Sequence, residues 1–362
     1  MIDDLHGIHP YPCKFPGAMV RPHLAGGGGT LLDPFCGSGT ALVEGARAGW
    51  HTVLGFDSNP IAVLISRFNL LSPAPALIAD CAAVLESIDV RAIRHNETDT
   101  LAFAGAHHWF DAHVRRELSA IRRFIDEQRD PAITLWLQIA LSRIVNRVGR
   151  QESETRYVAV DRPVEQGETA LRFLESCAAM LDALQTRPVL PASAQAGRCD
   201  VRAGLPLKDD SVDRIVTSPP YANTMDYYLY HKQRMNVLGF DFKTAQRAEI
   251  GSRHEFSSLK AAASKWDGDY AAVMAECRRV LKPGGYAIFI IGDSQIAGEL
   301  IDASDLTVRI GREAGLSCTV LDSIALSGRS RSFSRAFQRP NKREHTIRLE
   351  KRAAAFSGTA AT

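Results

Sequence analysis

Short apolar runs alternate with amphipathic stretches near the start of the chain. Residues 30–32 and 52–56 are apolar, and each run is followed by a turn and by a stretch of helical periodicity, residues 41–48 and 60–68. Strands that alternate with helices at this spacing are typical of βαβ units, whose crossovers are right-handed. The pattern therefore predicts a parallel sheet that starts with these two strands.

The pattern changes between residues 71 and 190, where turn signals become rare and apolar residues recur at helical spacing, as in Val114, Leu118, Ile121 and Ile125. The earlier alternation then returns, with strands expected at 213–217, 286–291 and 344–350, a helix at 270–281 and a turn at 282–285. The fold class predicted is α/β, a doubly wound Rossmann-like sheet. Its parts are a core of residues 1–70 and 191–352, a mainly helical insertion at 71–190 and a frayed tail at 353–362.

Composition adds limits to this picture. Hydrophobic residues make up 45% and charged residues 23% of the 362 residues, as in ordinary globular proteins. No apolar run approaches the roughly 20 residues of a membrane span, and the N-terminus lacks a signal-peptide pattern. The 7 cysteines are scattered, which favours reduced thiols and a cytoplasmic protein. Basic residues are concentrated at positions 329–343. This concentration fits a phosphate-binding surface and equally fits a loop that is exposed to solvent.

The first candidate for chemistry is Asp33-Pro34-Phe35-Cys36-Gly37-Ser38-Gly39-Thr40, between the first strand and its helix. Glycine permits close approach of the backbone to a ligand, and the helix that follows offers unpaired N–H groups. The next strand ends in Gly55-Phe56-Asp57-Ser58-Asn59-Pro60. A carboxylate at this strand end is placed to accept hydrogen bonds from ribose hydroxyls. Together the two segments predict a site for a nucleoside-type ligand.

The second candidate is Thr217-Ser218-Pro219-Pro220-Tyr221, which follows the strand at 213–217. Two successive prolines fix the backbone and supply no N–H groups, so the carbonyl between them is held rigidly. A tyrosine directly after this corner offers a flat face on which a base can stack.

This pair of motifs resembles the DNA amino-methyltransferases, which use S-adenosylmethionine to methylate the exocyclic nitrogen of cytosine or adenine. The resemblance covers residues 9–70 and 198–295 and implies S-adenosylmethionine as cofactor, with no metal. It implies that Asp57 binds the ribose and that Asp200 contacts the adenine amino group, although a surface-loop aspartate is the alternative for Asp200. The cofactor-binding residues implied are Phe15, Asp33, Pro34, Phe35, Cys36, Gly37, Gly39, Thr40, Asp57, Ser58, Asn59 and Asp200.

An exocyclic amine is a poor nucleophile because its lone pair is delocalised into the ring. Acceptors aimed at its hydrogens, the Ser218 hydroxyl and the Pro219 carbonyl, would localise that lone pair, while Pro220 holds the corner and Tyr221 stacks on the base. The catalytic residues predicted are thus Ser218, Pro219, Pro220 and Tyr221. The partner implied is DNA, either double-stranded with the target base flipped out or single-stranded.

Substrate contacts are assigned to Lys14, Asn223, Asp226 and Tyr227. The last three are equally well explained as the start of a helix that positions the corner. For Lys14 the alternative is that its proline-rich arm simply packs on the sheet. The helical insertion could read bases, form a homodimer surface or hold a partner subunit.

In the family, members with serine at the first position of the corner tend to methylate N4 of cytosine. Members with aspartate there tend to methylate N6 of adenine. The expected enzyme is therefore a site-specific DNA (cytosine-N4) methyltransferase, compatible with a restriction-modification setting. The alternatives are N6-adenine methylation, amino-methylation of RNA, and a non-catalytic nucleic-acid-binding subunit. C5-cytosine methylation is disfavoured, because the only Pro-Cys pair, Pro12-Cys13, precedes lysine and lies in the N-terminal arm.

Two further segments attract attention. His107, His108 and His113 suggest a metal site, but a helix start with Trp109 and Phe110 in a core is the better interpretation. Asp130-Pro131 is expected to end the same helix, which carries Arg115, Arg116, Arg122 and Arg123.

Overall fold

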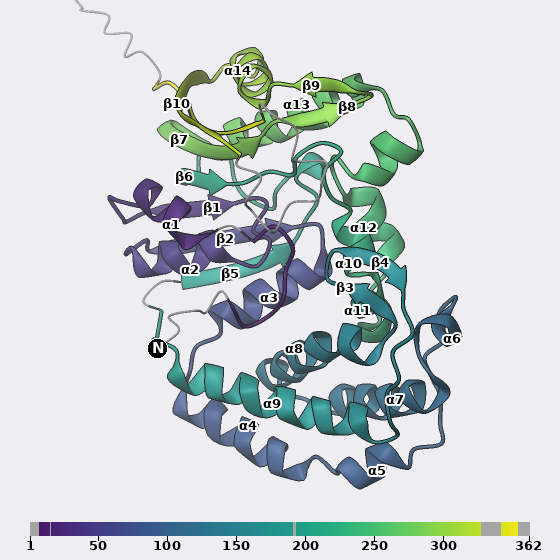
Figure 1. The fold of residues 1–362 in the computed structure, drawn as a ribbon. Helices are drawn as coiled ribbons and strands as arrows, with labels where there is room; N and C mark the ends of the chain where they lie inside the picture. Colours follow the sequence, from purple (N-terminus) through teal and green to yellow (C-terminus); the bar gives the residue numbers. More distant parts are fainter. Residues whose placement is uncertain (1–6, 15, 191–192, 327–341, 354–362) are drawn as a thin grey trace, which may run out of the picture.

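A seven-stranded sheet forms the centre of the protein (Figure 1), which is seen in a computed structural model that describes residues 7–14, 16–190, 193–326 and 342–353. The strand order is β10-β11-β7-β6-β1-β2-β5, in which β11 is antiparallel to both of its neighbours and the other pairings are parallel. The strands are β1 (Thr30–Asp33), β2 (Thr52–Asp57), β5 (Ser193–Arg198), β6 (Val212–Thr217), β7 (Leu281–Gly292), β10 (Ser317–Ala325) and β11 (Arg343–Glu350).

The chain runs outward from β1 through β2 to β5, and then returns to the other side of β1 to form β6 and β7. This reversal makes the gap between β1 and β6 the topological switch point, where open α/β sheets bind their ligands beyond the carboxyl ends of the strands. The doubly wound α/β fold expected from the sequence is confirmed.

Alternate residues of the strands serve two cores. Leu31 of β1 packs with α1 (Gly17–Val20) and α2 (Thr40–Arg47) on one face of the sheet. Its neighbour Leu32 packs on the other face with the cluster that includes α13 (Ala263–Val280) and α14 (Ala303–Glu313). Helices therefore cover both faces, as the near-continuous apolar runs of a parallel sheet require.

The segment at 71–190 is mainly helical, as expected. In Figure 1 its helices α4, α5, α7 and α9 lie together at the bottom of the view, beyond the β5 end of the sheet. They share a large apolar core with α3 and α8. The helices are α3 (Pro60–Leu70), α4 (Pro75–Ser87), α5 (Val90–Arg94), α6 (Ala106–Trp109), α7 (Ala112–Asp126), α8 (Pro131–Val148) and α9 (Glu168–Thr186). Phe110 is fully buried after α6, whereas Trp109 is half-buried.

The expectation for Asp130-Pro131 is wrong. Helix α7 already ends at Asp126, and Asp130 instead caps the start of α8 by accepting hydrogen bonds from the N–H groups of Ala132 and Ile133. Proline suits the first position of a helix because its missing N–H would have no partner there.

Several elements carry no clear sequence signal. The hairpin β3 (Gln151–Ser153) and β4 (Arg156–Ala159) interrupts the helical segment, and β5 is a polar edge strand. The turn expected at 282–285 lies inside β7, where the pairing with β6 shifts register. The remaining elements are η2 (Arg21–His23), η3 (Val201–Ala203), α10 (Tyr227–Tyr230), α11 (Lys232–Leu238), α12 (Phe242–Ala248), η4 (His254–Ser258), β8 (Ser294–Ile296) and β9 (Glu299–Ile301).

Some predicted features lie outside the described residues: residues 354–362 of the expected tail, Phe15, and the basic stretch except for Lys342 and Arg343. Within the described residues, no single helix has the length and apolar character to cross a membrane, although α3 and α4 meet those criteria as a pair bent by 120°.

The packing of α2 on β1 generates a prediction about stability. A Cβ at the buried Gly45 would lie 2.3 Å from Cδ2 of Leu31, which is itself fully buried. Gly45→Ala is therefore expected to lower the free energy of unfolding by about 1–2 kcal/mol, because overpacking outweighs the helix propensity gained. The matched control is Gly268→Ala in α13, where a Cβ meets open space and stability should stay equal or rise. Urea unfolding measures both, and equal stability of the two variants would contradict the tight contact.

Candidate active site

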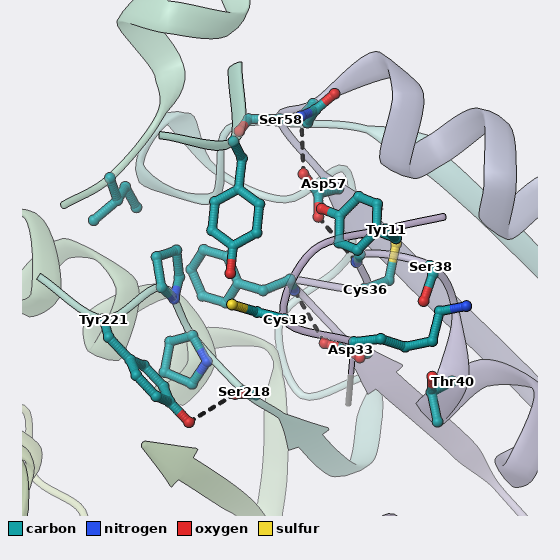
Figure 2. Close-up of a pocket in the computed structure, with 18 of the residues that line it drawn as sticks. Tyr11, Cys13, Asp33, Cys36, Ser38, Thr40, Asp57, Ser58, Ser218 and Tyr221 are labelled. Atoms are coloured by element: carbon teal, nitrogen blue, oxygen red, sulfur yellow. Dashed lines mark hydrogen bonds between the residues drawn. The ribbon is translucent and has the colours of Figure 1, made fainter. Parts of the chain in front are cut away.

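A cavity of about 400 Å³ lies beyond the carboxyl ends of β1, β2 and β6. Figure 2 shows Asp57 and Cys36 on one side of it, and Ser218 and Tyr221 on the other. The predicted site residues that line it are Lys14, Asp33, Phe35, Cys36, Gly37, Thr40, Asp57, Ser58, Asn59, Asp200, Ser218, Pro219, Pro220, Tyr221 and Tyr227. Pro34, Gly39, Asn223 and Asp226 are not among the lining residues. The structure thus brings the two distant motifs to one cavity.

The glycine-containing loop is built by backbone contacts. The N–H of Cys36 donates to the carbonyl of Phe56 at 2.9 Å, and the N–H of Gly39 donates to the carbonyl of Cys36 at 2.7 Å. Gly39 has a φ of 83°, and a Cβ there would lie 2.9 Å from the Ser66 hydroxyl oxygen, so glycine is required. Thr40 follows as the first residue of α2, and its buried hydroxyl has no partner in the described structure. That hydroxyl is available to a ligand in the cavity.

Asp57 ties the end of β2 to this loop. Its carboxylate accepts hydrogen bonds from the N–H groups of Gly37 at 2.9 Å and Asn59 at 2.8 Å. Burial raises the pKa of Asp57 to about 6. Asn59 caps α3 through its side-chain oxygen, whereas its buried Nδ2 has no partner among the described residues. A carboxylate and an amide donor are thus held side by side at the cavity wall.

Asp33 joins the ends of β1 and β6. Its Oδ1 accepts a hydrogen bond of 2.6 Å from the Thr217 hydroxyl and one of 3.0 Å from the N–H of Phe35. Burial raises the pKa of Asp33 to about 7, although the Thr217 hydrogen bond acts in the opposite direction. The bond fixes the residue directly before Ser218 against the strand that carries the glycine loop.

The Ser218-Pro219-Pro220-Tyr221 corner is buttressed by the last strands of the sheet. The Tyr221 hydroxyl donates a hydrogen bond of 2.9 Å to Glu344 of β11 and lies 3.5 Å from the Ser218 hydroxyl. A Cβ at Gly292 of β7 would lie 2.7 Å from the Tyr221 ring, so the ring rests on a bare backbone. Glu344 was not among the site residues predicted from the sequence, since only the pairing of β7 with β11 brings it to the corner.

The N-terminal arm forms another wall. The Tyr11 ring stacks on Tyr227 with 6.0 Å between centroids and on His231 with 5.2 Å. The arm is anchored to the helical segment, because His9 shares a 2.9 Å hydrogen bond with the Ser142 hydroxyl of α8. Tyr11 was also missed; the signal available was an aromatic residue between the prolines at 10 and 12.

The residues after the corner begin a helix and hold the surrounding loops. Glu249, which sequence analysis missed, accepts hydrogen bonds from the N–H groups of Tyr227 and Tyr228 at the start of α10. Asp226 accepts one of 2.8 Å from the N–H of His254. The Asn223 amide donates to the Gln295 carbonyl at 2.7 Å. Of the three residues assigned to the substrate after the corner, Tyr227 is the one that lines the cavity.

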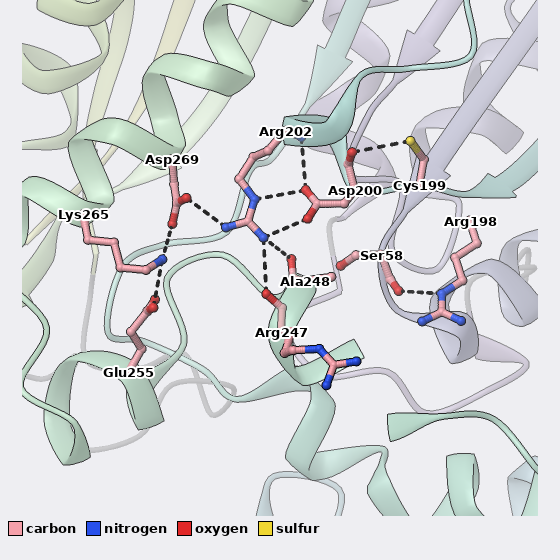
Figure 3. A network of polar contacts seen from close by, with 10 residues as sticks. All are labelled: Ser58, Arg198, Cys199, Asp200, Arg202, Arg247, Ala248, Glu255, Lys265 and Asp269. Carbon is pink, nitrogen blue, oxygen red and sulfur yellow. Dashed lines mark hydrogen bonds and ion pairs between the residues drawn. The ribbon is translucent and has the colours of Figure 1, made fainter. Parts of the chain in front are cut away.

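Asp200 stands in a network of ion pairs (Figure 3). Arg202 donates hydrogen bonds to both carboxylate oxygens of Asp200, at 3.0 Å from Nε and at 2.8 Å from Nη2. The same guanidinium pairs with Asp269 of α13 at 2.8 Å and donates to the Ala248 carbonyl at 3.1 Å. Arg202 thereby connects the wall that carries Asp200 to the wall formed by residues 245–250.

The cavity suits a cationic ligand. Asp33, Asp57, Glu249 and Glu344 all line it, and burial raises the pKa of each. Ionised carboxylates in such a place lack solvation, so a positive charge in the cavity would stabilise them. The sulfonium of S-adenosylmethionine is such a charge, and Asp57, Asn59 and Thr40 offer groups for its ribose and amino-acid portions. The residues present therefore fit the cofactor that the resemblance implies.

One group of metal-type ligands lies beside the site. Among the described residues, Asp293, Asp302 and His345 bring three such atoms within 4.8 Å of one another. Asp293 accepts a hydrogen bond from His345 at 3.0 Å and one from the N–H of Ala303 at 2.9 Å, while Asp302 caps α14. These contacts explain the cluster without a metal ion, because the three side chains hold β7, β11 and α14 together.

Comparisons with known proteins agree with the two motifs. Residues 212–350 match a family model described as DNA methylase, and residues 15–83 match one described as RMKL-like, methyltransferase domain. The chain is 24% identical over 250 residues to the type II methyltransferase M.MvaI of Kocuria varians, covering 64% of this chain and 54% of that protein. It is 39% identical over 69 residues to the type II methyltransferase M.MjaII of Methanocaldococcus jannaschii, covering 18% of this chain and 13% of that protein.

The chain thus spans about half the length of the first of these curated relatives. Among solved structures, a TehB-like SAM-dependent methyltransferase from Corynebacterium glutamicum is 11% identical, with 93% of this chain and 87% of that chain covered and a TM-score of 0.35. That score is too low to add to the fold derived from the strand order.

The Thr217–Asp33 hydrogen bond generates a prediction with a defined pH dependence. The pKa of Asp33 is about 7 in the folded state and lies above its unfolded value, so its ionisation lowers the stability of the fold as pH rises from the unfolded value to about 7, and the loss stays constant above that. Thr217→Val removes the donor and should enlarge that loss. We expect it to cost about 1–3 kcal/mol at pH 8.5 and less at pH 6.

Urea unfolding at the two pH values measures the difference. Thr217→Ser keeps a hydroxyl and is the matched control, which should retain most of the stability. A cost of Thr217→Val that is the same at both pH values would show that the bond does not depend on the charge of Asp33.

Proposed function

Because the chain belongs to the DNA amino-methyltransferase family, we propose that it transfers a methyl group from S-adenosylmethionine to an exocyclic amine of DNA, with N4 of cytosine as the target. The observation that carries the proposal is the shared cavity: the Ser218-Pro219-Pro220-Tyr221 corner faces the glycine-containing loop across it, and the Thr217–Asp33 bond joins their strands. The DNA target is supported by the curated relatives, which are type II methyltransferases.

The residues on the cofactor side of the cavity would bind and orient S-adenosylmethionine. When bound, S-adenosylmethionine supplies an electrophilic methyl group attached to a sulfonium. Asp57 accepts hydrogen bonds from the ribose hydroxyls while its backbone donors keep the carboxylate in place. The Thr40 hydroxyl and the first N–H groups of α2 receive the carboxylate of the amino-acid portion. Asp200 faces the adenine, held by Arg202.

The corner activates the amine. The Ser218 hydroxyl and the Pro219 carbonyl accept the two amine hydrogens, which favours a tetrahedral nitrogen with its lone pair directed toward the methyl group. Because Pro219 and Pro220 fix the backbone, these acceptors need no reorganisation during the reaction. Tyr221 offers its ring to the base. The catalytic contribution of the corner is therefore positioning and preorganised dipoles.

A base inside a duplex cannot reach a cavity at the strand ends, so a double-stranded target requires the base to leave the stack. Serine at the first position of the corner supports cytosine, on the tendency of the family. The helical segment at 71–190 lies beside the N-terminal arm that covers the cavity, through the His9–Ser142 bond, and is our candidate for target recognition.

The test of the proposed function is mass spectrometry of nucleosides from DNA treated with the purified chain and S-adenosylmethionine. We expect N4-methylcytosine, and a loss of at least 100-fold with Ser218→Ala, since one preorganised hydrogen-bonding group is worth about 100–1,000-fold in rate. Ser264→Ala, at an exposed serine of α13, is the matched control and should keep full activity. N6-methyladenine in place of N4-methylcytosine would overturn the base assignment, and methylation of RNA alone would overturn the DNA substrate.

Cofactor binding is expected to release protons. Asp57 and Asp33, with pKa values of about 6 and about 7, are partly protonated near pH 6, whereas the bound cation and ribose favour their ionised forms. The dissociation constant of S-adenosylmethionine should therefore fall as pH rises from 5.5 to 8, with proton release near pH 6 that vanishes by pH 8.5.

Calorimetry in two buffers of different ionisation enthalpy measures this release. Asp57→Asn should weaken binding and reduce the number of protons released, whereas Asp80→Asn, at an exposed position of α4, should change neither. Binding that is independent of pH, without proton release, would contradict the assignment of these carboxyls to the cofactor site.

A further inference from the structure

Glu344 is set apart from the other carboxyls of the cavity. It lies on β11, half-buried at the cavity wall, and its neighbours across the sheet are Gly292 on β7 and Ile324 on β10, neither of which is charged. In the described part of the chain, the hydroxyl of Tyr221 is the one hydrogen-bond donor to its carboxyl. The carboxyl of Glu344 is thus hydrogen-bonded to the Ser-Pro-Pro-Tyr corner and to no backbone group of the described residues.

The remaining carboxyls already hold the backbone in place. Asp57 accepts two backbone N–H groups, and so does Glu249. Asp33 accepts the N–H of Phe35 and the hydroxyl of Thr217. Asp200 is gripped by Arg202. A proton added to any of these groups would weaken a contact that holds the backbone or a neighbouring side chain of the cavity, whereas Glu344 has as its one donor among the described residues the Tyr221 hydroxyl, which belongs to the corner itself.

The proposed reaction produces a proton that must leave. As the amine nitrogen bonds to the methyl carbon, the carbon–sulfur bond breaks and its electron pair stays on sulfur. The nitrogen is then positively charged and becomes neutral again only when one of its N–H protons departs. Inside the cavity this proton needs an acceptor within reach of the corner.

We propose that Glu344 receives this proton through Ser218 and Tyr221, an inference that rests on the proposed function. The amine passes its proton to the Ser218 oxygen, the Ser218 hydroxyl proton moves to the Tyr221 oxygen 3.5 Å away, and the Tyr221 proton moves to Oε1 of Glu344 at 2.9 Å. One proton leaves the nitrogen and one arrives on Glu344, so both hydroxyls end the step as they began. Glu344 acts through Tyr221 and is a positioning residue for the proton path.

The surroundings of Glu344 favour this role. Burial raises the pKa of Glu344, so its carboxylate is a better proton acceptor than an exposed one. The titratable groups close to it and to Tyr221 are His345 on its own strand and Cys13 on the N-terminal arm. His345 is occupied on the opposite face of β11, between Asp293 and the Ser323 hydroxyl, which leaves Glu344 as the group that faces the corner.

The test is the pH profile of a single turnover on DNA with Glu344→Gln, which can still accept the Tyr221 hydrogen bond but cannot take up a proton. Wild-type rates should rise with pH as Glu344 ionises and then level off. Glu344→Gln should be slower by about 100-fold and should lack that rise, because general-base contributions are typically 100-fold or more. Tyr221→Phe, which keeps the ring for stacking, should show the same flat profile. Affinities for S-adenosylmethionine and DNA should stay within twofold in both variants.

The matched control is Glu350→Gln, at the end of the same strand, where the carboxylate pairs with Arg348 at the surface. Its rate and profile should equal those of the wild type. Thermal unfolding against pH gives a readout apart from activity: the wild type should lose stability relative to Glu344→Gln as pH rises, because its buried carboxyl must ionise.

The outcomes separate the two proposals. A wild-type chain that methylates no DNA overturns the proposed function and this inference with it. An active wild type together with an unchanged rate and profile in Glu344→Gln overturns the inference alone. If the rate of Glu344→Gln is independent of pH while Tyr221→Phe keeps the wild-type pH profile, the route through Tyr221 is wrong.

Discussion

The hydrogen bond between Thr217 and Asp33 joins two segments that the chain separates by more than half its length. It lies at the point where the sheet reverses its winding, between β1 and β6. Parallel strands alone would leave the loops beyond their ends free to separate. Because a buried carboxylate without a donor is costly, this bond makes the close approach of the two motifs a condition of stability. The same contact that stabilises the sheet therefore determines the width of the cavity.

Burial of carboxyls is the second constraint on this site. Asp33, Asp57, Glu249 and Glu344 line one cavity, and burial raises the pKa of each, so the ligand-free protein carries an electrostatic cost there. Backbone N–H groups offset part of that cost for Asp33, Asp57 and Glu249. A ligand with a positive charge offsets more. Stability and affinity are therefore coupled through the same groups, as is common at sites that favour a charged ligand.

Local patterns were enough to predict the two loops, since Gly37 and Gly39 in one and the double proline in the other restrict the backbone within a few residues. The helical character of residues 71–190 was likewise readable from spacing. The polar edge strand β5 was not, because its alternation is not hydrophobic and its pairing with β2 decides its structure. Glu344 escaped notice for a related reason: its relation to Tyr221 exists only once β11 has inserted between β7 and β10. The roles of the individual site residues stay predictions.

The position of β11 in the sheet has a consequence for the order in which the site is assembled. The ribosome delivers the glycine-containing loop first and the corner much later, yet the hydrogen-bond acceptor for Tyr221 comes from residues 343–350. A nascent chain that has not reached this strand has the residues of the parallel part of the sheet, including Gly292 behind the Tyr221 ring, but lacks Glu344, which accepts the hydrogen bond of the Tyr221 hydroxyl. Completion of the cavity wall is thereby linked to completion of the sheet.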